Sequence, residues 1–204
     1  MLPDLLAPPL CWSCSSPAAR GEPLCRACRR SLRFLPAAPI ALGGLETWAP
    51  VAYDGAARDL VKALKFRGAA GLAGAMAALI VANAPAGILT GTLVPVPLHP
   101  ARRRTRPYNQ AARLAEAISS RADLPLADCL RRAGSVSRQV GRGRTARLSG
   151  TAGSFGATAP APPTALLVDD VVTTGATLVA CAAAVRAAGA RQVGAIAFAR
   201  TAGR

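Results

Sequence analysis

Two adjacent carboxylates end an apolar run, and a turn rich in hydroxyls and glycine follows them. The stretch is "LLVDDVVTTGATL", residues 166–178, in which Asp169 and Asp170 form the acidic doublet. Two neighbouring carboxylates repel each other and lose hydration beside a buried strand, so they need partners that compensate for both costs. The vicinal hydroxyls of a sugar are such partners, because each can donate a hydrogen bond to a carboxylate oxygen.

The turn behind the doublet has the composition of a phosphate site. Consecutive backbone N–H groups can wrap an anion there, a glycine permits close approach, and the dipole of the following helix favours negative charge. The residues expected to hold the phosphate are Thr173, Thr174, Gly175, Ala176 and Thr177. A nucleotide hydrolase would need a G-x-x-x-x-G-K-[ST] loop, and neither lysine of the chain lies in one. A plain strand–turn–helix with polar caps explains one Asp or Thr, but not a doublet beside such a turn.

Four cysteines are spaced as metal ligands in "CWSCSSPAARGEPLCRAC". Two C-x2-C pairs, Cys11 with Cys14 and Cys25 with Cys28, are separated by ten residues. Each pair can direct two thiolates at one metal, so the pattern predicts a structural zinc ribbon with a closed coordination sphere. A pair of disulfides is the alternative, which a cytosolic location disfavours. Cys181 falls in an alanine-rich helical pattern and is expected to be a small core residue.

Positive charge is concentrated in the middle of the chain. The net charge is +15, and residues 100–147 hold twelve arginines against three acids, a net charge of +9. This block indicates an anionic partner, either the phosphates of a small molecule or a nucleic-acid backbone, or else a solvated basic surface. The first ten residues lack a basic leader, and the uncharged stretch 68–98 is broken by Asn83 and Pro85. We therefore expect a cytoplasmic protein without membrane insertion.

Strand and helix patterns alternate along the rest of the chain. Strands are expected at 51–53, 92–98, 165–168 and 193–199, and helices after residue 54, at 72–82, at 109–122 and up to about residue 188. Residues 36–50 are interpreted as a linker with a turn at Gly43-Gly44. Lys65 either reaches the ligand site from its helix or lies on a solvated helix face, and the second position is expected. The alternation predicts an α/β fold with a mostly parallel sheet covered on both faces. In such sheets the ligand lies beyond the carboxyl ends of the strands, where "VPVPLHPARRR" and "VDDVVTTGAT" both stand.

These motifs together resemble a known family. The cysteine ribbon, "YDGAARDLVKALKFRG", "LVPVPLHPARRRTRPYNQAARLA", "SRQVGRGRTARL" and "LLVDDVVTTGATL" follow one another in this order over nearly the whole chain. The last is similar to the signature of type I phosphoribosyltransferases, and the ordered set resembles the ComF family, the ComFC-like proteins linked to DNA uptake in competent bacteria. The chain departs from the family pattern in "LSGTAGSF", which keeps Phe155 but lacks the usual Asn, and at Pro107-Tyr108, where Gly usually precedes the aromatic residue.

The resemblance implies a fold and a ligand. It implies a zinc ribbon at 1–35, a linker at 36–50, and a Rossmann-like type I phosphoribosyltransferase domain at 51–204 with a mobile basic hood at 131–150. The ligand would be phosphoribosyl pyrophosphate with Mg²⁺, its ribose on Asp169 and Asp170 and its 5′-phosphate on residues 173–177. The pyrophosphate would face the loop 97–106, and the candidates there are His99, Arg102, Arg103 and Arg104. The candidates in the hood are Arg138, Gln139, Arg144 and Arg147.

Different functions are compatible with this resemblance. The protein would be a phosphoribosyltransferase acting on an unidentified nucleophile in the setting of DNA uptake. The alternative is a non-catalytic accessory that binds single-stranded DNA and a helicase partner, and a third is a regulator that senses phosphoribosyl pyrophosphate. His99 is either a base or phosphate contact or a residue that packs the loop.

Overall fold

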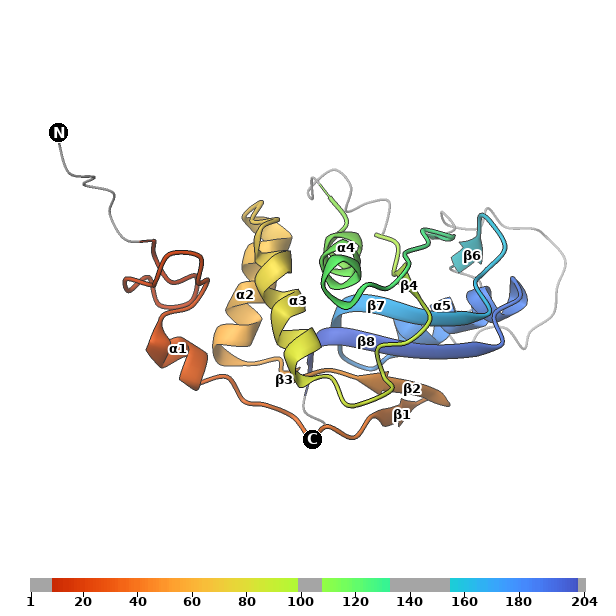
Figure 1. Ribbon diagram of the computed structural model, residues 1–204, viewed down its shortest axis with the longest axis horizontal. Helices are drawn as coiled ribbons and strands as arrows, with labels where there is room; N and C mark the ends of the chain where they lie inside the picture. Colours follow the sequence, from red (N-terminus) through yellow and green to blue (C-terminus); the bar gives the residue numbers. More distant parts are fainter. Residues whose placement is uncertain (1–8, 99–107, 133–154, 202–204) are drawn as a thin grey trace, which may run out of the picture.

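The computed structural model describes residues 9–98, 108–132 and 155–201 (Figure 1). The helices are α1 (Arg26–Arg30), α2 (Gly55–Phe66), α3 (Leu72–Asn83), α4 (Gln110–Ala122) and α5 (Ala176–Ala187). The strands are β1 (Ile40–Leu42), β2 (Leu45–Trp48), β3 (Val51–Ala52), β4 (Thr92–Pro95), β5 (Leu130–Arg132), β6 (Phe155–Ala157), β7 (Thr164–Val172) and β8 (Gln192–Arg200). Eight residues expected at the ligand lie outside the described residues: His99, Arg102, Arg103, Arg104, Arg138, Gln139, Arg144 and Arg147.

Parallel pairing dominates the main sheet. Its order is β1-β2-β8-β7-β4, and β3 also pairs with β8. Only β1 runs antiparallel to its neighbour among these pairs. β2 and β3 pair with the same strand on either side of Pro50, which has no N–H to donate to the ladder. The predicted α/β fold with a mostly parallel sheet is therefore confirmed.

Helices cover both faces of the sheet (Figure 1). The core that α2, α3 and α4 share with one face includes Leu166 and Val168 of β7. On the other face Leu167 packs with α5. The continuous apolar run of β7 is what a strand buried on both faces requires. Leu60 and Leu64 of α2 are fully buried, as their spacing of four predicts.

The stretch interpreted as a linker contains two strands of the sheet. β1 and β2 form a hairpin joined at Gly43 and Gly44, where the turn was expected. Both glycines have positive φ, +54° and +77°, a conformation that side chains with a Cβ disfavour. β2 buries Leu45 and Trp48. Strands of three and four residues between prolines are too short to produce a recognisable alternation, so the sequence pattern shows only the turn.

The cysteine segment packs directly on α2. Cys11, Leu24 and Leu32 belong to the same buried core as Leu60. Ser13 Oγ donates a hydrogen bond to Asp59 Oδ2 at 2.7 Å. The ribbon thus shares its core with the larger domain, so the two must be stabilised together.

The uncharged stretch 68–98 holds α3 and β4, a helix and a strand as expected. None of the helices within the described ranges is both long enough and apolar enough to span a bilayer.

Candidate functional site

Asp169 and Asp170 lie inside β7 rather than after it. The strand continues through Val172, which still pairs with Arg200 of β8, so the expected strand end at residue 168 is wrong by four residues. Because consecutive side chains of a strand point to opposite faces, the two carboxylates leave β7 in different directions. Asp170 forms an ion pair with Lys65 of α2, whereas the charge of Asp169 affects the thiol of Cys181 in α5.

Asp170 forms an ion pair with Lys65 of α2. Lys65 Nζ lies 2.7 Å from Asp170 Oδ1, and the two side chains are only 17% and 9% exposed. The expectation that Lys65 lies on a solvated face is therefore wrong. Val61 is fully buried one helical turn earlier, and this spacing of four places Lys65 on the side of α2 that faces the sheet. That spacing was the sequence signal that could have identified it.

Asp169 affects the electrostatics on the α5 side. Its Oδ1 accepts a hydrogen bond from the backbone N–H of Asp170 at 2.8 Å. Burial raises the pKa of the Cys181 thiol, the nearby Asp169 charge raises it further, and Arg132 lowers it in part. Cys181 is fully buried and so stays a neutral thiol, the small core residue that was predicted.

A cavity of about 180 Å³ joins these groups at the carboxyl ends of β4 and β7. Asp169 and Asp170 line it together with Lys65 and Arg132. Arg132 ends β5, and its guanidinium carbon lies 4.9 Å from the centre of the Phe155 ring, a cation–π contact that orients it. The sequence prediction had identified the acids of this cavity. Of the two cations in its described lining, the prediction had weighed Lys65 as a residue that reaches the site and had not named Arg132.

The threonine-glycine turn forms a smaller hollow beside this cavity. The hollow measures about 40 Å³ and is bounded by Asp169 and residues 171–178, while one water molecule needs only about 10–15 Å³. Gly175 has φ +76° and precedes the first residue of α5, whose N-terminus has no side-chain cap. Thr174 Oγ1 accepts from the Ala176 N–H at 3.4 Å. Hydroxyls, backbone N–H groups and a helix N-terminus are the donors that a phosphate takes.

Gly175→Ala should destabilise the protein more than Gly44→Ala. Both glycines have φ near +76°, so alanine is strained by about 1–2 kcal/mol at either position. Only at Gly175 would a Cβ come within 2.8 Å of Leu42 Cδ1, whereas at Gly44 it would meet nothing within 4 Å. We expect urea unfolding to show that Gly175→Ala lowers the free energy of unfolding by about 1 kcal/mol or more beyond the effect of Gly44→Ala. Equal losses would mean that Leu42 does not constrain the turn.

The segments on either side of residues 99–107, which lie outside the described part of the chain, contribute to the lining of the same cavity. The Asn109 side chain donates to the Val96 carbonyl at 3.0 Å and accepts from the Ala111 N–H at 3.1 Å, which caps α4. The Tyr108 hydroxyl donates to the Leu64 carbonyl at 2.7 Å, and burial raises the pKa of Tyr108. Leu98 and Asn109 both line the cavity, as does Arg132 before the second gap.

Four cysteines form a separate cluster. The Sγ atoms of Cys11, Cys14, Cys25 and Cys28 lie within 4.8 Å of one another, and Cys14 and Cys25 are 3.6 Å apart. A tetrahedral zinc with bonds of about 2.3 Å separates its sulfurs by about 3.8 Å. All four cysteines are free thiols, so the cluster could hold a zinc ion as predicted. Hydrogen bonds from Ser16 lower the pKa of Cys14 to about 6, and burial raises the pKa of Cys28 to about 12.

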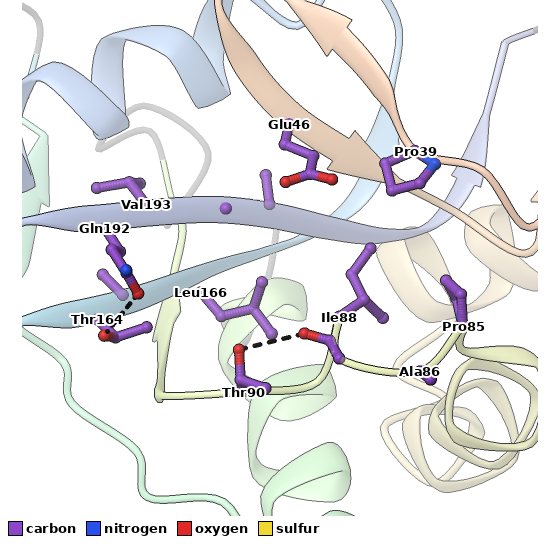
Figure 2. Close-up of a pocket in the computed structure, with 14 residues that line it drawn as sticks. Pro39, Glu46, Pro85, Ala86, Ile88, Thr90, Thr164, Leu166, Gln192 and Val193 are labelled. Carbon is purple, nitrogen blue, oxygen red and sulfur yellow. Dashed lines mark hydrogen bonds between the residues drawn. The ribbon is translucent and has the colours of Figure 1, made fainter.

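A larger cavity lies at the opposite edge of the sheet, and Figure 2 shows its lining. It measures about 550 Å³ and includes the first residues of β7 and β8, Thr164 and Gln192, whose side chains are hydrogen-bonded at 3.3 Å. Glu46 reaches it from β2, and its described lining contains no lysine or arginine. A phosphorylated ligand suits the smaller cavity, whose described lining holds Lys65 and Arg132, better than this one.

No family model matches the sequence, and no curated protein matches it. One solved structure that is similar is described as the allosteric regulatory enzyme of purine biosynthesis, with a TM-score of 0.38 and 20% sequence identity. The similarity covers 70% of this chain and 26% of that chain, so this protein spans about a quarter of the other's length.

Proposed function

We propose that the protein binds phosphoribosyl pyrophosphate with Mg²⁺ and is a phosphoribosyltransferase of the ComF type, acting in DNA uptake. One observation carries the proposal: the cavity of the acidic doublet and the hollow of the threonine-glycine turn share Asp169 and Thr177 in their linings. Acceptors for sugar hydroxyls and donors for a phosphate therefore lie side by side. A ribose 5-phosphate needs this combination.

The residues of the cavity have separate tasks in this proposal. Asp169 and Asp170 accept hydrogen bonds from the ribose hydroxyls, and the turn 173–177 donates to the 5′-phosphate. Arg132 offers a guanidinium to the pyrophosphate. Mg²⁺ would neutralise charge on the leaving pyrophosphate when bound. An acceptor nucleophile then forms a bond to the anomeric carbon and loses a proton as the bond to pyrophosphate breaks, so the protein contributes positioning and charge stabilisation.

The experiment is a calorimetric titration with phosphoribosyl pyrophosphate and Mg²⁺, followed by a matched pair of sugars. Ribose 5-phosphate presents a vicinal diol, and 2-deoxyribose 5-phosphate lacks one of its two hydroxyls. Since a hydrogen bond to a charged group contributes about 1.5–3 kcal/mol, we expect the deoxy sugar to bind about 10–100-fold more weakly. Equal affinities for the two sugars would contradict the assignment of the doublet to ribose.

A non-catalytic accessory that binds single-stranded DNA and a helicase is the alternative, and the net charge of +9 over residues 100–147 favours it. Against it, the one aromatic residue of this block is not available for base stacking. Tyr108 is partly buried against the core, and its hydroxyl is bonded to Leu64. If this alternative holds, oligonucleotide binding falls steeply with salt and weakens when arginines in 131–147 are removed, while Asp170→Asn leaves it unchanged.

A further inference from the structure

The Lys65–Asp170 ion pair places a positive charge beside the second carboxylate of the proposed site. We infer that Lys65 is a positioning residue, whose ammonium group holds the Asp170 carboxylate ionised and oriented for a sugar hydroxyl. The inference rests on the proposed function for the identity of the ligand. The effect of Lys65 on the Asp170 carboxylate can be measured in the absence of any ligand.

Burial is the reason that Asp170 needs a counter-charge. Its side chain is 9% exposed, and a carboxylate removed from water favours its protonated form unless a cation compensates. Among the described residues, the charged groups that line its cavity are Lys65 from α2, Arg132 from β5 and its neighbour Asp169. Asn109 and Gln110, which α4 brings to the cavity, carry no charge. Of the two cations, Lys65 forms an ion pair with Asp170 at 2.7 Å.

The position of the ammonium group is fixed by the end of α2. Leu64, the preceding residue, is fully buried, and its carbonyl accepts the 2.7 Å hydrogen bond from Tyr108. The helix backbone next to the lysine is therefore held at Leu64, both by the core and by the segment that opens α4. Lys65 can move only through its own side-chain torsions, of which burial leaves few.

The test compares lysine variants on one helix. Lys65→Met removes the charge, and Lys65→Gln also removes it but keeps a hydrogen-bond donor. Lys65→Arg restores the charge. Lys62→Met is the matched control, because Lys62 is exposed on the same helix and forms no ion pair that the structure describes. Lys65→Gln serves if Lys65→Met fails to fold.

The first measurement follows the carboxyl carbon of Asp170 by NMR as pH changes, with the signal assigned by its loss in Asp170→Asn. We expect its titration midpoint to rise in Lys65→Met and Lys65→Gln, because the carboxyl group then stays buried without its counter-charge. Lys65→Arg should largely restore the original midpoint. A midpoint that does not move in either neutral variant would overturn the inference.

The second measurement is the affinity for ribose 5-phosphate between pH 6 and 9, expressed as the ratio of Lys65→Met to Lys62→Met. The ratio removes the ligand's own phosphate titration. We expect about a tenfold deficit at pH 6 that disappears by pH 9, whereas a purely structural defect would be independent of pH. A ratio that is constant with pH contradicts the inference. If not even the wild type binds the sugar, the proposed function fails, and the carboxyl titration still decides whether Lys65 controls Asp170.

Discussion

Cys14→Ser should release bound zinc and destabilise the whole protein, not the ribbon alone. Cys14 is exposed, so its replacement removes almost no packing, and any loss of stability reports the loss of a ligand. The ribbon contributes Leu24 and Leu32 to the core of α2 and α3. Opening the ribbon therefore exposes part of the main core. We expect the free energy of unfolding to fall by at least about 3 kcal/mol, which is the cost of losing one buried leucine. For a chain of this length such a loss lowers the Tm by about 6–12 °C.

Zinc content and thermal unfolding, measured on the same samples, check this expectation. Cys181→Ala is the control, because Cys181 is a buried residue of α5 and lies outside the cluster, so this variant should keep its zinc. Zinc affinity should also fall as pH falls. Burial raises the pKa of Cys28 to about 12, so this thiol is protonated near neutrality, and metal binding must displace its proton. A Cys14→Ser protein with unchanged zinc content and Tm would contradict a structural metal site.

The features that sequence predicted well depend on local spacing. The two C-x2-C pairs bring four sulfurs within 4.8 Å, as their separation indicated. The alternation of apolar strands with amphipathic helices correctly predicted a mostly parallel sheet, covered on both faces. In each case the residues that define the feature are near neighbours in the chain, or repeat with a fixed period. A short segment of sequence is then enough to determine them.

The features that sequence missed depend on contacts between distant segments. The spacing within α2 places Lys65 on the side that faces the sheet, but it does not show that Lys65 meets Asp170 of β7, which depends on how the chain folds between the two segments. β7 extends four residues further than expected, because Val171 and Val172 continue to pair with β8. The short hairpin of β1 and β2 likewise forms through its pairing with β8. Tertiary pairing overrides weak local preference at each of these places.

Asp170→Asn should abolish pyrophosphate release in the presence of phosphoribosyl pyrophosphate, Mg²⁺ and the correct acceptor. Asparagine has almost the same shape, and its carbonyl oxygen can still accept from Lys65, so the fold should survive. The change removes the negative charge that strengthens the hydrogen bond from a sugar hydroxyl. At about 1.5–3 kcal/mol for such a bond, affinity for ribose 5-phosphate should fall about 10–100-fold. Calorimetry and pyrophosphate release measure the two effects.

Glu46→Gln is the matched control, since it makes the same chemical change at an exposed carboxylate in the cavity at the opposite edge of the sheet. We expect it to bind and react like the wild type, and an Asp170→Asn protein that behaves in the same way would refute the location of the site. Combining Asp170→Asn with Lys65→Met adds a stricter condition. If Lys65 acts through Asp170, the double variant binds ribose 5-phosphate no more weakly than Asp170→Asn alone, because the lysine then has no carboxylate to position. Additive losses would mean that Lys65 contacts the ligand by itself.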